Sequence, residues 1–137
     1  MTLSAQGYID RIKAALSHSP ILETWVILTE MTLGDRGHFR VRLTLKNGDF
    51  VEASEFFCIQ ATGIEQQRYR YQWMDPTKTK LRKRWDNAPH FPEIATFPHH
   101  VHVEQEDQVF PSAMLGILDL VVLLESAMGD ASAPDAP

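Results

Sequence analysis

The feature that most constrains this chain is a segment in which apolar and polar side chains alternate. Between His38 and Lys46, every second position carries Phe, Val or Leu, and the positions between them carry Arg or Thr. Successive side chains of a β-strand point to opposite faces of a sheet, so this pattern predicts a strand with one buried and one solvated face. Asn47-Gly48 follows directly and is a strong hairpin signal. We therefore expect an antiparallel sheet that is covered on one side.

The neighbouring segments predict five strands of this kind, joined as an antiparallel meander. The expected strands lie within residues 25–33, 38–46, 49–59, 66–73 and 81–86. Turn signals rich in Gly, Asp and Pro separate them. If the last two strands pair as a hairpin, their arginines share one face above Tyr and Trp side chains. Like charges on one face lower the stability of a sheet, which favours a function for these arginines.

A helix is expected at each end of the sheet. Ser4 is a suitable N-cap for a first helix that stops before Pro20, and Pro111 suits the first turn of a second helix. The predicted fold class is therefore α+β, an antiparallel β-meander of about five strands flanked by an N-terminal and a C-terminal helix. We expect one domain over residues 1–128 and a disordered tail over residues 129–137.

The charges are unevenly distributed along the chain. The net charge is −5, yet all 13 Lys and Arg residues lie at or before Arg84. The acidic total disfavours a protein that coats DNA, whereas a local basic patch can attract RNA within about 8–10 Å. The single cysteine excludes an internal disulfide, and the N-terminus does not resemble a signal peptide, so we expect a cytoplasmic protein. The most apolar stretch, residues 114–124, is too short to span a membrane.

Four of the six histidines lie between residues 90 and 102 and mark the candidate site. Metal-free cleavage of an RNA strand needs a base for the 2′-hydroxyl, cations for the phosphate and an acid for the leaving oxygen, and His, Arg and Tyr side chains can meet these needs, while Asp86 can orient an imidazole. The candidate catalytic residues are His90, His99, His102, Asp86 and Arg84. The candidate substrate-binding residues are Arg68, Arg70, Arg82, Tyr71 and Asn87. No cofactor is expected for this chemistry.

Two other interpretations fit the same region. His99, His100 and His102 could hold the metal ion of a metal-dependent phosphoesterase, with Asp86 or Glu104 supplying an oxygen ligand, although no HExxH or CxxC spacing supports this. Alternatively, the basic sheet face could dock an acidic partner protein without any catalysis. A homodimer formed through the apolar C-terminal helix is compatible with all three interpretations.

Three segments resemble a known family. They read Tyr69-Arg70-Tyr71-Gln72-Trp73, then Arg84-Trp85-Asp86-Asn87-Ala88-Pro89-His90, and then Thr96-Phe97-Pro98-His99-His100-Val101-His102. The chain resembles in these segments the TumE-like toxins of bacterial toxin–antitoxin systems. The resemblance implies the toxin of a type II system that acts on RNA and is encoded beside a helix-turn-helix antitoxin. Phe91 departs from the expected pattern, which has a second histidine after His90.

Overall fold

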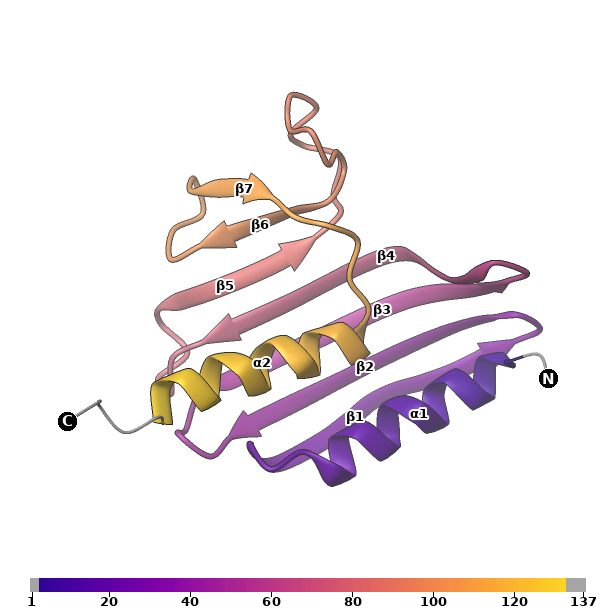
Figure 1. The fold of residues 1–137 in the computed structure, drawn as a ribbon, viewed down its shortest axis with the longest axis horizontal. Helices are drawn as coiled ribbons and strands as arrows, with labels where there is room; N and C mark the ends of the chain where they lie inside the picture. Colours follow the sequence, from indigo (N-terminus) through magenta and orange to yellow (C-terminus); the bar gives the residue numbers. More distant parts are fainter. Residues whose placement is uncertain (1–2, 133–137) are drawn as a thin grey trace.

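The computed structural model describes residues 3–132, in which a helix, seven strands and a second helix follow one another (Figure 1). The elements are α1 (Ala5–His18), β1 (Leu22–Leu33), β2 (Arg36–Leu45), β3 (Phe50–Gln60), β4 (Gly63–Met74), β5 (Leu81–Asp86), β6 (His100–Val103), β7 (Val109–Pro111) and α2 (Ile117–Ser132). All seven strands belong to one sheet, and each pairs antiparallel with the next along the chain. The predicted α+β meander between two helices is confirmed.

The alternation along β2 sorts its side chains onto the two faces of the sheet. Phe39, Val41 and Leu43 are fully buried, and both helices lie over this face (Figure 1). Burying one such side chain stabilises the fold by about 1.5–3 kcal/mol. The residues between them, Arg40 and Arg42, lie on the opposite face, where no helix covers them.

The first helix begins and ends where the sequence predicts. The Ser4 side chain accepts a hydrogen bond from the Gly7 N–H at 2.9 Å, as an N-cap does. Residues one turn apart along α1 are buried against the sheet. They are Tyr8, Ile9, Ile12 and Leu16.

The expected number of strands is wrong, because the sheet has seven rather than about five. The two additional strands, β6 and β7, are four and three residues long, which is too short for alternation to be recognised. β7 is an edge strand and contains Pro111. A proline is tolerated at the edge because its missing N–H leaves no ladder hydrogen bond unmade.

The second helix begins at Ile117, not in the turn after Pro111. Its first N–H groups have side-chain partners: Ile117 donates to the buried Glu55 at 2.8 Å, and Gly116 donates to Asp119 at 2.9 Å. A Cβ on Gly116 would lie 2.6 Å from the Gln66 side-chain nitrogen, so only glycine allows this close approach to the sheet.

The far end of α2 also differs from the expected domain boundary. The helix continues to Ser132, beyond the boundary expected at residue 128. Residues 133–137 of the expected tail lie outside the described residues. Among residues 3–132, no helix combines the length and the apolar character needed to cross a bilayer.

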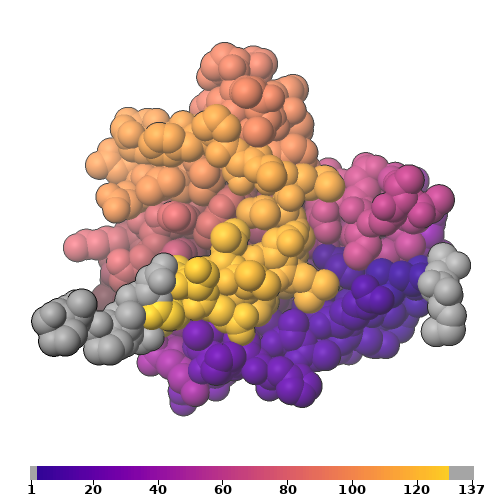
Figure 2. All heavy atoms as spheres, viewed as in Figure 1, coloured from indigo at the N-terminus to yellow at the C-terminus, as the bar shows by residue number. Residues whose placement is uncertain are grey.

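A long loop separates β5 from β6. Residues 87–99 contain no strand or helix and project away from the rest of the molecule (Figures 1 and 2). The same loop contains His90 and His99 and leads directly into the histidines of β6. The loop and the face of the sheet opposite the helices together form the candidate site.

Candidate functional site

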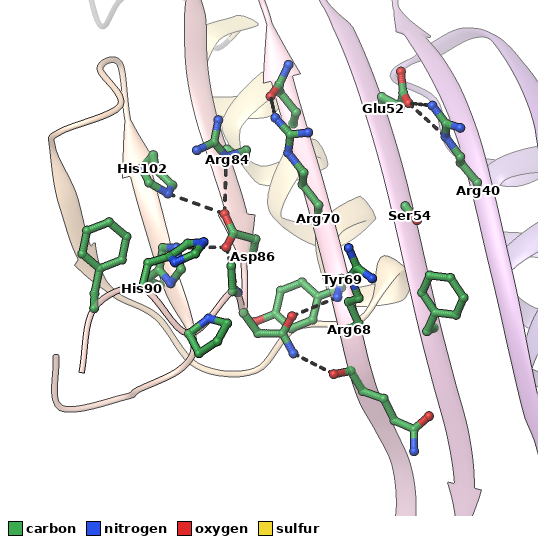
Figure 3. A pocket seen from close by; sticks show the side chains of 18 of the residues that line it. Arg40, Glu52, Ser54, Arg68, Tyr69, Arg70, Arg84, Asp86, His90 and His102 are labelled. Carbon is green, nitrogen blue, oxygen red and sulfur yellow. Dashed lines mark hydrogen bonds and ion pairs between the residues drawn. The ribbon is translucent and has the colours of Figure 1, made fainter. Parts of the chain in front are cut away.

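A groove of about 1210 Å³ lies on the sheet face opposite the helices, between β2 and the 87–99 loop. Its charged side chains come from alternate positions of neighbouring strands, which places Arg68, Arg70 and Arg84 on one side of the sheet. Figure 3 shows Asp86 and His102 facing one another at one end of this groove and the Arg40–Glu52 pair at the other. The predicted basic face and the predicted histidine region therefore form one concave surface.

Three buried groups form a compact cluster at the loop end of this groove. Asp86 on β5 lies directly opposite His100 on β6, and His102 follows two residues later on the same face. The Nε2 atoms of His100 and His102 lie 3.0 and 3.5 Å from the two Asp86 carboxylate oxygens. Only 7% of Asp86, 2% of His100 and 4% of His102 is exposed. We call these three residues the His–Asp cluster.

Backbone carbonyls hold both imidazole rings of the His–Asp cluster. The Nδ1 atom of His100 lies 2.9 Å from the Pro98 carbonyl oxygen, and that of His102 lies 2.8 Å from the Glu106 carbonyl oxygen. A carbonyl oxygen only accepts hydrogen bonds, so each Nδ1 carries the proton. The other ring nitrogen, Nε2, is thereby directed at the Asp86 carboxylate.

Arg84 connects the His–Asp cluster to the rim of the groove. Its Nε donates to Asp86 at 3.3 Å, and its two terminal nitrogens bind both oxygens of Glu106 at 2.6 and 2.5 Å. The Glu106 carboxylate raises the pKa of Arg84, and Arg84 lowers the pKa of Glu106. Arg84 is therefore held in ion pairs with two carboxylates, whereas the arginines of β4 form no such pair with any described residue.

Arg68 and Arg70 project from β4 without an ion pair to any residue within 3–132, although the charge of Arg70 helps to lower the pKa of Glu106. Both side chains are exposed, and neither forms an ion pair with any residue that the structure describes. The only polar partner of Arg70 within hydrogen-bonding distance there is Gln72, at 2.9 Å. An arginine without an acidic partner can donate two parallel hydrogen bonds to a phosphate group.

The groove contains an aromatic pair that the sequence did not indicate. His38 and Phe56 stack with their ring centroids 3.7 Å apart and an interplanar angle of 10°. They lie opposite one another in the β2–β3 register, 39% of Phe56 is exposed, and burial lowers the pKa of His38. Only the pairing of two strands brings these rings together, so no local motif could have revealed them.

His90 and Asn87 are both placed at the groove by the loop. His90 is exposed and lines the same groove as Asp86 and His102, and Figure 3 shows it on the loop side of that groove. Asn87 has a different role from the expected one, because its side chain accepts from the Tyr69 N–H and donates to the Gln67 carbonyl, both at 3.0 Å. These two bonds fasten the start of the loop to β4.

Three predicted site residues lie away from the groove. Arg82 binds Asp49 with two hydrogen bonds of 2.9 and 3.1 Å, because an irregularity in the β4–β5 pairing turns it away from Arg84. Tyr71 is fully buried under α2, where it donates to Glu55 at 2.7 Å. The structure places neither residue where it could contact a substrate in the groove.

His99 is the third of these residues, and its position also corrects the expected metal site. Its Nδ1 lies 2.9 Å from the Tyr69 hydroxyl, its ring stacks on that tyrosine, and burial lowers its pKa. The expected metal-ligand set of His99, His100 and His102 is therefore not assembled. Among residues 3–132, the group that could hold an ion is instead Asp86, His100 and His102, whose ligand atoms lie within 4.8 Å of one another.

Comparison with known proteins identifies the family. A family model described as Toxin TumE matches residues 11–126, which include every strand of the sheet and most of both helices. No curated protein and no solved structure gives a significant match to the chain. The matched segment contains the groove and the His–Asp cluster. The chain belongs to the TumE toxin family.

Proposed function

We propose that this toxin acts on RNA by binding a single strand across the groove and cleaving it at the end formed by the His–Asp cluster. The observation that carries the proposal is the placement of two unpaired arginines, Arg68 and Arg70, beside a buried group of acid and imidazole side chains. The arginines can bind the phosphate backbone, and the buried cluster contains the kinds of side chain that transfer protons or stabilise charge in catalytic sites.

The shape of the groove favours a single strand over a duplex. Its lining extends from β2 to β6, a width of about 19 Å at the usual spacing of neighbouring strands. The stacked His38 and Phe56 rings offer a platform for an unpaired base at one end, as aromatic side chains do in other single-strand-binding proteins. Such a platform is useful only to a base whose face is free.

In this proposal His90 takes the proton of the attacking 2′-hydroxyl as the bond from the 2′-oxygen to phosphorus forms, and the 5′-oxygen that leaves phosphorus takes a proton from water in the open groove. It is the exposed histidine on the loop side of the groove, and imidazole is the side chain most often used as a base near neutral pH. Arg68 and Arg70 stabilise the charge that grows on the phosphate. His102 is buried and both of its nitrogens have partners, so it acts as part of the cluster and not as a separate group.

The proposal includes the partner and setting that the family implies. A toxin that cleaves RNA would act in the cytoplasm and be held inactive by a helix-turn-helix antitoxin of a type II system. Expression of the chain alone should stop growth, and expression together with the antitoxin should restore it. A homodimer through the exposed Val122 and Leu123 of α2 is a further expectation, which light scattering of the purified protein would test.

RNA binding provides the most direct test of the groove. Replacing both Arg68 and Arg70 by Ala should remove two phosphate contacts, because neither arginine is held in an ion pair by any residue that the structure describes. The slope of log K against log salt concentration for a single-stranded RNA should then become shallower by about 1.4, since each contact contributes about 0.7. Arg11→Ala is the matched control, because Arg11 is exposed on α1, on the other side of the sheet.

The same variants separate binding from chemistry. Asp86→Asn keeps the size of the side chain, so it should leave RNA binding intact while abolishing cleavage and growth arrest. Unchanged salt dependence in the double arginine variant would refute the groove as the RNA site. Full toxicity of Asp86→Asn would refute the cluster as the reactive end.

A further inference from the structure

We propose that Asp86, His100 and His102 bind one divalent transition-metal ion. Metal binding by these residues does not depend on the action on RNA, but the role of the ion in cleavage rests on the function proposed above. The inference follows from the way in which the fold orients the two imidazole rings around one carboxylate.

The first argument concerns the nitrogen atoms that face Asp86. The carbonyl groups of Pro98 and Glu106 keep the proton of each neutral ring on Nδ1, so each Nε2 presents a lone pair. In His100 this lone pair lies 3.0 Å from a carboxylate oxygen, which also presents lone pairs. Two lone pairs at this distance repel one another unless a proton on Nε2 or a metal ion lies between them.

A metal ion satisfies this requirement with the geometry present. Two ligand atoms that are each about 2.0–2.1 Å from a tetrahedral zinc ion lie about 3.3 Å apart. The Nε2 of His100 lies 3.0 Å from one Asp86 oxygen and the Nε2 of His102 lies 3.5 Å from the other, so each imidazole–carboxylate separation is close to this value. One ligand atom from each of the three residues lies within 4.8 Å of the other two, so a small adjustment of side chains, with no change of strand register, would bring all three to one ion.

The surroundings of the cluster resemble those of metal-binding histidines. Such histidines usually donate their other ring N–H to a carbonyl or carboxylate, which fixes the orientation of the ring. Both rings of the cluster do so here. Asp86 is held in turn by the Ala88 N–H at 3.0 Å and by Arg84 at 3.3 Å. All three ligands are thus oriented before an ion arrives.

The local charge also favours a cation. Apart from the imidazoles, the groups in direct contact are the carboxylates of Asp86 and Glu106 and the guanidinium of Arg84, which leaves a net charge of −1. Water screens the charge of the buried Asp86 only weakly, whereas the Glu106 side chain is 68% exposed and its charge is screened more strongly. A divalent ion entering the site meets an attractive potential even though an arginine lies nearby.

The donor set selects the class of metal. Two imidazole nitrogens and one carboxylate oxygen suit zinc and other first-row transition metals, whereas magnesium and calcium prefer sites made of oxygen atoms. Three protein ligands leave at least one coordination position open toward the groove, as in catalytic sites. An ion there would supply positive charge to a phosphate held by Arg68 and Arg70.

Metal binding is measured on the full chain after treatment with a chelator and dialysis. Zinc titration in competition with a coloured chelator should give one equivalent bound, and zinc should raise the thermal unfolding temperature, because an ion that binds only the folded state stabilises it. Magnesium should neither displace the bound zinc nor raise the unfolding temperature. The absence of saturable 1:1 zinc binding would overturn the inference.

Two variants and one control locate the bound ion. Loss of a residue that only hydrogen-bonds to a metal ligand typically weakens metal binding about 10–100-fold. Asp86→Asn and His102→Gln each remove a ligand itself, so each should weaken zinc binding by more than this. His99→Ala should keep the affinity of the unchanged chain, because His99 bonds to Tyr69 outside the cluster. Circular dichroism verifies that each variant folds. In nitrogen-15 NMR of the unchanged chain, zinc should shift the resonances of the Nε2 atoms of His100 and His102 but not those of their Nδ1 atoms.

These outcomes are distinct from failure of the proposed function. A chain that binds zinc through the cluster but neither cleaves RNA nor stops growth would retain the metal site and lose the proposed action on RNA. A chain that cleaves RNA fully in the presence of a chelator and binds no zinc would retain the action on RNA and overturn the metal site. Equal loss of zinc affinity in His99→Ala would also overturn it.

Discussion

Glu55 and Asp86 are buried carboxylates on opposite faces of the sheet, and they have opposite kinds of partners. On the helix-covered face, Glu55 accepts hydrogen bonds from the Tyr8 and Tyr71 hydroxyls at 2.5 and 2.7 Å and from the Ile117 N–H at 2.8 Å. On the groove face, Asp86 is surrounded by a guanidinium and two imidazoles.

The difference shows how neighbours decide what a buried acid does. The partners of Glu55 are uncharged, and burial raises its pKa, so it acts as a hydrogen-bonding anchor that holds the start of α2 to the sheet. The partners of Asp86 are basic side chains, so this carboxylate is the point at which Arg84, His100 and His102 meet. The apolar core thus lies on one face of the sheet, and the groups of the candidate site lie on the other.

The largest expected effect compares two neighbouring phenylalanines of β3 that point to opposite faces. Phe57 is fully buried, whereas 39% of Phe56 is exposed in the groove. Phe57→Ala should lower the free energy of unfolding by about 3–5 kcal/mol, because it leaves a cavity in the core. Urea denaturation followed by circular dichroism measures this loss.

Phe56→Ala is the counterpart on the groove face. It should change stability far less than Phe57→Ala, and it should weaken single-stranded RNA binding by about 1–3 kcal/mol if a base stacks on the ring. A large loss of stability in Phe56→Ala, or unchanged RNA binding, would show that the two faces are not divided as the comparison states.

A smaller effect concerns the pH dependence of the Glu55 anchor. Because its pKa is higher in the folded chain than the ordinary value of 4.5, the folded state holds the proton more tightly than the unfolded state does. The contribution of Glu55 to stability is therefore present in full at low pH and is lost as the pH rises from about 4.5 through its raised pKa.

Glu55→Gln isolates this contribution, since glutamine does not titrate. The free energy of unfolding of the unchanged chain minus that of Glu55→Gln should decrease as the pH rises from 4 through this window, as measured by urea denaturation at each pH. Glu93→Gln is the control, because Glu93 is exposed on the 87–99 loop. A difference that increases with pH would contradict the raised pKa.

The smallest expected effect distinguishes two arginines of the expected basic face. Arg82→Ala breaks a pair with Asp49 in which the Arg82 side chain is 45% exposed, so it should cost on the order of 1 kcal/mol of stability. It should leave RNA binding unchanged, whereas Arg70→Ala should weaken it. Fluorescence anisotropy with labelled RNA measures both affinities. If Arg82→Ala and Arg70→Ala weaken RNA binding equally, Arg82 is part of the RNA site.

Local patterns were sufficient for much of the fold and for part of the site. The alternation of β2 predicted its buried face, and the Ser4 cap predicted the start of α1. The groove brings the arginines of β4 together with His100 and His102, whereas His99 lies outside it. The pairing of β6 with the sheet, the strand β7 and the start of α2 were not predicted, since their position depends on contacts with β5 and Glu55 rather than on local pattern.

The sequence by itself determined which side chains share a face, because a strand alternates with a period of two regardless of its surroundings. Tertiary structure alone decided which of these side chains meet. Strand register pairs Asp86 with His100 and excludes His99, and an irregularity in the pairing of β4 with β5 turns Arg82 toward Asp49. Shifting the pairing register of a strand by one residue moves all of its side chains to the opposite face of the sheet. Hydrogen bonds between segments that are distant in the sequence determine this register, and local sequence does not.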